Sequence, residues 1–131
     1  MNRAAIVATL RGPLYAANLG LPVAWPNVPA PGDAPRIDVA WADPDRTDPT
    51  LAMDSPIERG RMILTAVTPA DEGEDPGNVL GDQLRAAYPA CTRLPGAGVL
   101  VLLGVPLVRT GFRDGDEWRV PVVVPYTAYP A

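Results

Sequence analysis

The most informative stretch of the chain reads Trp118-Arg119-Val120-Pro121-Val122-Val123-Val124-Pro125-Tyr126. Large apolar residues occupy its alternate positions, so they lie on one face of a β-strand and can be buried together. Pro121 and Pro125 share the other parity, and they remove two backbone donors from a single edge of that strand. We therefore predict a terminal strand at the margin of a sheet, where its proline-bearing edge resists pairing with stray chains.

The composition argues against an enzyme. The 131 residues include no His and no Lys, and Ser55 and Cys91 are the only residues of their kinds. The usual general base, Schiff-base amine and histidine metal ligand are therefore missing. A chain of this length suits one hydrophobic core. We expect a single domain over residues 1–131, without catalytic residues, cofactor-binding residues, metal ligands or a cofactor.

The charge pattern argues against nucleic-acid binding and membrane insertion. The net charge is −4, and the eleven basic residues are all arginines, scattered singly from Arg3 to Arg119. A nucleic-acid-binding surface typically needs a cluster of cations. The longest apolar runs, such as Val99–Leu103, are too short to span a bilayer. We expect no membrane partner and no specific binding of DNA.

Two helices are predicted. Asn2 can cap a first helix, in which Ile6, Leu10 and Leu14 recur near helical spacing. Gly12-Pro13 should kink or end that helix near Arg11, because proline inside a helix costs about 3 kcal/mol. The second helix starts at Asp75-Pro76 and ends at Pro89. Its expected inner stripe consists of Val79, Leu80, Gln83, Leu84, Ala87 and Tyr88.

Alternating residues predict strands over Arg36–Trp41 and residues 57–67, which should pair as a hairpin. An apolar strand follows at Val99–Leu103, and Asp114-Gly115 is the strongest hairpin signal, leading into the terminal strand. A minor strand near Trp25 would add one more. The predicted fold class is α+β: an antiparallel four- to five-stranded sheet with two helices packed on one face, in the order α-β-β-α-β-β.

Residues 43–55 read as a long acidic loop that contains Pro44 and Pro49. Loops of this length are usually functional or disordered, so this one is the best candidate for a surface that becomes ordered on assembly. It lacks the turn glycine and closing glutamate of a calcium loop. Tyr129, expected beyond the last strand, could be an interface anchor. The interaction candidates are Asp45, Arg46, Asp48, Leu51, Met53 and Tyr129.

Several segments together carry a resemblance to a known family. They are Leu21-Pro22-Val23-Ala24-Trp25-Pro26-Asn27-Val28-Pro29, the strand over Arg36–Trp41, Arg59-Gly60-Arg61-Met62-Ile63-Leu64-Thr65-Ala66-Val67, the helix that follows, and the terminal stretch. In this order they resemble the tail terminator proteins of long-tailed, siphovirus-like phages and of gene transfer agents, which include the tail terminator of phage lambda. The similarity covers nearly the whole chain.

The resemblance implies a structural virion protein. Its expected form is a homo-oligomer, a hexameric ring that caps the tail tube and joins it to the head-tail connector or stopper protein, with a lumen that lets DNA pass. The expected location is the virion tail, after assembly in the bacterial cytoplasm. Three alternatives stay open: a head-tail stopper or other neck protein; from another class, a monomeric small-ligand-binding domain; and a degenerate enzyme, which the missing catalytic side chains disfavour.

Overall fold

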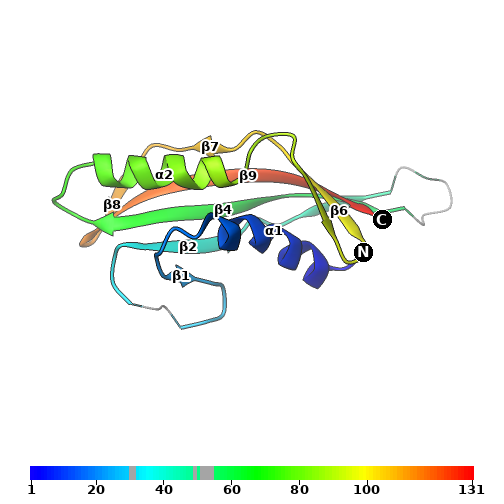
Figure 1. The fold of residues 1–131 in the computed structure, drawn as a ribbon, viewed down its shortest axis with the longest axis horizontal. Helices are drawn as coiled ribbons and strands as arrows, with labels where there is room; N and C mark the ends of the chain where they lie inside the picture. Colours follow the sequence, from blue (N-terminus) through cyan, green and yellow to red (C-terminus); the bar gives the residue numbers. More distant parts are fainter. Residues whose placement is uncertain (30–31, 49, 51–54) are drawn as a thin grey trace.

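A computed structural model of the chain describes residues 1–29, 32–48, 50 and 55–131. These residues form two helices and one nine-stranded sheet (Figure 1). The helices are α1 (Arg3–Ala17) and α2 (Asp75–Ala87). The strands are β1 (Val23–Ala24), β2 (Arg36–Trp41), β3 (Asp45–Thr47), β4 (Ile57–Pro69), β5 (Arg93–Gly96), β6 (Val99–Leu103), β7 (Leu107–Val108), β8 (Phe112–Asp114) and β9 (Glu117–Pro130).

The sheet is mixed, and it is larger than the sequence predicts. Its order is β1-β2-β4-β9-β6-β5, while β3 pairs with β4, and β7 and β8 pair with β9. β1 runs parallel to β2, and the remaining pairs are antiparallel. The α+β class is confirmed, but the four- to five-stranded antiparallel sheet is wrong. The strands that the sequence hides are short pieces of two to four residues, in which no period-two pattern can stand out.

The terminal strand lies in the middle of the sheet, so the predicted marginal position is wrong. On one side β9 pairs with β4 from Glu117 to Ala128. On the other side it pairs in turn with β8, β7 and β6. Of the residues predicted to be buried together, Val120, Val122, Val124 and Tyr126 are buried, whereas Trp118 is only partly buried. The alternation therefore identifies the strand and its inner face but not its neighbours.

Pro121 and Pro125 lie where the partner strand changes. The Arg109 N–H donates to the Pro121 carbonyl, and the Gly104 N–H donates to the Pro125 carbonyl, each at 2.8 Å. Both carbonyls thus face one edge, as parity requires. Pro121 falls between the pairings with β8 and β7, and Pro125 falls between those with β7 and β6. Neither proline has a backbone N–H to donate toward this edge of β9. The edge is therefore paired by three short strands, β8, β7 and β6, instead of remaining open.

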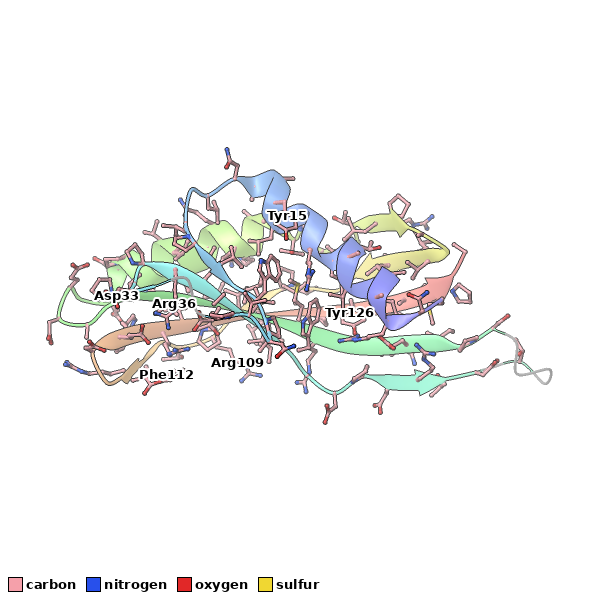
Figure 2. All side chains as sticks on the ribbon, turned by 90° about the horizontal axis from the view of Figure 1, so that it is seen from below. Tyr15, Asp33, Arg36, Arg109, Phe112 and Tyr126 are labelled. Atoms are coloured by element: carbon pink, nitrogen blue, oxygen red, sulfur yellow. The ribbon has the colours of Figure 1, made fainter. Side chains whose placement is uncertain are left out.

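Both helices lie on the same side of the sheet (Figure 2). α2 approaches β9 closely because Gly77 and Gly81 face it. A Cβ on Gly77 would lie 2.9 Å from side-chain atoms of Trp118 and Val120. This glycine face turns Val79 outward, where it is 57% exposed, so its predicted place in the inner stripe is wrong. Leu80, Leu84 and Tyr88 are buried as predicted.

The first helix runs from Arg3 to Ala17 with Pro13 inside it, so the predicted end near Arg11 is wrong. Asn2 caps α1 as expected, with its side-chain oxygen 2.8 Å from the Ala5 nitrogen. Beside Pro13, the Tyr88 hydroxyl donates to the Leu10 carbonyl at 2.6 Å and also bonds to the Leu14 backbone. A side-chain hydroxyl therefore joins the helical ladder where proline perturbs it. Burial of Leu10 and Leu14 on either side of the proline holds one helix together.

The two predicted hairpins are confirmed. β2 pairs with β4, which places Ile37 opposite Ala66 and Val39 opposite Leu64. β8 turns into β9 through Gly115 and Asp116. Gly115 has φ +63°, the conformation that a glycine at the first central position of a tight hairpin turn supplies without strain. The minor strand near Trp25 is also present, as β1.

Candidate interaction surface

β3 and the start of β4 form an arm that extends beyond the helix layer (Figure 2). Asp45 lies opposite Arg59 and Arg46 lies opposite Glu58 in this pair. The prediction that residues 43–55 are entirely loop is therefore wrong for β3. All three β3 residues are exposed, so Asp45 and Arg46 are presented at the surface of the arm. The Arg46 side chain also donates a hydrogen bond to Glu58, which is buried.

Glu58 is a buried carboxylate that joins the arm to the body. Its residue is 2% exposed, and it accepts hydrogen bonds from Arg3 at 2.9 Å, Arg46 at 3.0 Å and the Tyr126 hydroxyl at 3.1 Å. A buried charge is tolerated only when it is paired in this way. Burial raises the pKa of Tyr126 above its ordinary value, so its hydroxyl remains a donor. The cluster thereby ties α1, β3, β4 and β9 together.

Gly60 makes room for this cluster. A Cβ at position 60 would lie 2.6 Å from the Tyr126 hydroxyl oxygen. No side chain larger than hydrogen fits there unless Tyr126 moves away from Glu58. The glycine therefore belongs to the same structural unit as the carboxylate.

Asp48 has a local role. Its carboxylate accepts bonds from the Thr50 hydroxyl at 2.6 Å, the Thr50 N–H at 2.9 Å and the Ser55 N–H at 3.0 Å. The bond from the Thr50 hydroxyl is the main cause that holds the pKa of Asp48 below its ordinary value. Asp48 thus stabilises the backbone around it. Leu51 and Met53, the apolar candidates of the same segment, lie outside the described residues.

Tyr129 lies within β9 opposite Leu100, so the prediction that it follows the last strand is wrong. Its side chain shares the parity of Val123 and Pro125, on the side of the sheet away from the helices, here called the outer face. Figure 2 shows Arg109 and Phe112 on this side. The apolar or aromatic residues of the outer face are partly or fully exposed: Ile63, Leu100, Leu102, Leu107, Phe112, Pro121, Val123, Pro125 and Tyr129.

Of the sequence candidates, the structure places Tyr129 and Asp45 on the outer face. The sequence nevertheless carries a signal for the apolar residues of this face. In β6 both parities are apolar, which is typical of a strand that is covered twice or lies at an interface. The structure covers Val99, Val101 and Leu103 with the core and leaves Leu100 and Leu102 half-buried. A second partner is therefore needed to cover the outer residues of this strand.

One end of the outer face is closed by an ion-pair network. Arg36, with a side chain 10% exposed, bonds to Asp38 at 2.8 Å and to Glu117. Arg119 bonds to Asp38 at 3.1 Å and to Glu117 at 3.2 Å. The hydrogen bond from Arg36 is the main cause that holds the pKa of Glu117 below its ordinary value. The network covers Val67, which neighbours Arg36 and Arg119 in register.

The described residues offer little for chemistry. Among residues 1–29, 32–48, 50 and 55–131, no three His, Cys, Asp or Glu side chains are grouped so as to hold a metal ion. In the same part of the chain, no helix is long and apolar enough to cross a membrane. The open hollow beside Leu107, Arg109, Phe112 and Pro121 is part of the outer face. Surfaces, rather than an enclosed site, are the features with functional potential.

A family model described as phage tail terminator protein matches residues 3–126. The chain belongs to the phage tail terminator family. A solved structure with 22% sequence identity superposes on this tail terminator with a TM-score of 0.75, covering 98% of this chain and 96% of that chain. This likeness shows the fold. A comparison with curated proteins finds no match.

The family is one of structural tail proteins, which implies a place in the virion tail and a tail tube as partner. For a tail terminator, contact surfaces matter more than catalytic pockets. The structure offers two of them, the arm formed by β3 and β4 and the outer face of the sheet.

Proposed function

We propose that six copies of this tail terminator form a ring that ends the tail tube and joins it to the head-tail connector or stopper. The family match over residues 3–126 carries this proposal. A ring requires each copy to present two different complementary surfaces. The outer face supplies one such surface, because it exposes apolar side chains on strands whose other face is buried in the core, and the exposed arm remains available for a partner outside the ring.

The charge of the chain supports a lumen through which DNA passes. One copy carries a net charge of −4, and a ring lined by such subunits does not attract phosphates as a DNA-binding protein does. DNA is therefore a passenger in this proposal and not a bound partner.

Mass measurement and tube capping test the proposal together. The purified protein should show a mass of about 83 kDa by light scattering and native mass spectrometry, six times the 13.9 kDa of one chain. Added to polymerising tail tube protein from the same particle, it should bind tube ends and stop growth, which electron microscopy can measure. Glu58→Ala, which frees the arm, should lose capping. A protein that stays monomeric and leaves tube growth unchanged would refute the function.

A mass of six copies without binding to tubes, but with binding to the head connector, would instead identify a stopper or another neck protein. Virions disrupted into heads and tails provide the independent check. The protein should remain with the tail fraction, as judged by mass spectrometry of both fractions.

A further inference from the structure

The arginines of the chain divide into two groups. Six of the eleven form ion pairs, and Arg11 stacks over the Trp25 ring at 4.7 Å. The other four make no ion pair with any residue that the structure describes: Arg59, Arg61, Arg93 and Arg109. All four are exposed, and all four lie on the outer face.

The pairing register places these arginines around the apolar part of the outer face. Arg59 lies in one cross-strand row with Thr127, Leu102 and Arg93, running from β4 through β9 and β6 to β5. Arg61 lies opposite Pro125 in the next row. Arg109 donates its N–H to Pro121, further along the same strand. Apolar side chains rimmed by unpaired cations are typical of a protein–protein contact with an acidic partner.

The opposite end of the molecule has the complementary charge. We call it the acidic end, and it consists of Asp33, Asp71, Glu72, Glu74, Asp75, Asp114 and Asp116, all exposed. These residues are neighbours, because Asp116 accepts the Ala70 N–H and Arg113 pairs with Asp71. Five of the seven make no ion pair with a described residue: Asp33, Glu72, Glu74, Asp75 and Asp116.

Arg59, Arg61 and Arg93 lie far from the acidic end of their own copy, whereas Arg109, opposite Pro121, is four residues from Glu117 along β9, about 14 Å. Arg61 lies opposite Pro125, and the acidic end begins near Glu117, eight residues away along β9. At about 3.4 Å per residue, this separation is about 27 Å. Charges at that distance are screened at physiological salt, where the Debye length is about 8 Å. Arg61 and Arg93, which have no carboxylate opposite them in register, therefore need a partner outside their own chain.

We infer that the acidic end of one copy docks on the outer-face arginines of the next copy. This contact rests on the proposed ring and gives it a chemical basis. The contact is heterologous, since one copy contributes its acidic end and the other its outer face, which is the type of contact that closes a ring. It covers the half-buried apolar side chains of β6 and β9 and neutralises both unpaired charge groups in one step.

Charge reversal on each surface tests the contact. Arg61→Glu with Arg93→Glu reverses the outer face, while Glu72→Arg with Asp116→Arg reverses the acidic end; none of these four side chains makes a described hydrogen bond or ion pair. Each double variant alone should elute as a 13.9-kDa monomer. An equimolar mixture should recover the wild-type mass, because each reversed surface then meets its reversed complement. Unchanged thermal midpoints show that both variants are folded.

The control has the same change in charge at another place. Asn78→Glu with Gln83→Glu and Arg85→Glu lowers the charge by four on the exposed side of α2, as the outer-face variant does, and should keep the wild-type mass. Unchanged mass in both double variants would overturn the inference while the proposed ring stands. A monomeric wild-type protein would overturn both.

Two other results would show that the outer face binds a partner other than a second copy of the chain. If the outer-face variant keeps its mass but no longer caps tubes, the arginines contact the tail tube protein, and the inference is overturned. If the wild-type protein binds duplex DNA and this variant does not, while both keep the same mass, the arginines contact phosphates, which overturns it equally.

Discussion

At the scale of single residues, the Glu58 carboxylate does more than any other group to fix the arm. Its three partners come from three separate elements, and each gives it a charge-assisted or neutral hydrogen bond of 2.9 to 3.1 Å. The side chains of Arg3 and Arg46 are 38% and 45% exposed, so water could replace part of their hydrogen bonding if Glu58 were removed. The carboxylate itself has no access to water.

Glu58→Ala should therefore lower the free energy of unfolding by about 2 kcal/mol, within the range for hydrogen bonds to charged groups. Chemical denaturation measures this loss. The control is Asp82→Ala, which removes a surface pair with Arg85 whose side chains are more than half exposed and should cost less than about 0.5 kcal/mol. Equal losses of unfolding free energy in the two variants would mean that the buried cluster stabilises the protein no more than an exposed ion pair does.

Glu117 gives the chain a predictable response to acid. Its pKa is held below the ordinary value of 4.5, first by the hydrogen bond from Arg36. A carboxyl whose folded pKa is lowered contributes stability that is present above pH 4.5 and is lost as the pH falls through the folded value. Glu117→Gln should thus be less stable than wild type at pH 7, by about 1.5 kcal/mol.

The same comparison at low pH decides the cause. Once Glu117 is protonated in the folded protein, the wild type has lost its ion pairs, so the two curves of unfolding free energy against pH should converge below pH 4.5. A difference that stays constant down to pH 3 would attribute the loss to packing instead of charge.

At the scale of elements, two of the helical glycines, Gly12 and Gly77, give different predictions for the same substitution. Apart from its two chain neighbours, a Cβ at Gly12 meets nothing within 4 Å, whereas a Cβ at Gly77 lies 2.9 Å from Trp118 and Val120. Gly12→Ala should change the stability by less than about 1 kcal/mol, because the gain in helix propensity is opposed by the clash between the new Cβ and the Pro13 ring. Gly77→Ala should destabilise it by about 1–3 kcal/mol, because it forces α2 off the sheet. Thermal unfolding of both variants tests the packing, and a stabilised Gly77→Ala would contradict it.

Helices and strands that are long enough to show a repeating hydrophobic pattern can be predicted from the sequence, and shorter ones cannot. Both helices, β2, β4 and the buried face of β9 follow from alternation or helical spacing. β7 has two residues and β8 has three, so only their partner β9 makes them strands. Next to Pro13, α1 accepts a hydrogen bond from Tyr88, which is 78 residues away from Leu10 in sequence. A local pattern cannot reveal such a contact.

At the scale of the whole molecule, the sequence shows the sign of the charge but not its distribution. The net charge of −4 and the absence of a basic run can both be read from the sequence. The folding of β4, β5 and the Arg109 segment into one sheet brings four scattered arginines onto one face. The interaction candidates from residues 43–55 reflect the same difficulty, since only Asp45 and Arg46 of that segment are presented on a described strand.

The assembled protein should not hold DNA, although each free copy exposes four unpaired arginines. In the proposed ring those arginines are neutralised by acidic ends, and six copies carry −24, six times the −4 of one chain. Fluorescence anisotropy with labelled duplex DNA at physiological salt should give a dissociation constant weaker than about 10⁻⁴ M, the upper limit for non-specific DNA-binding proteins. Saturable binding in the micromolar range that weakens steeply with added salt would contradict this, because it would require the arginines of the outer face to point into the path of the DNA.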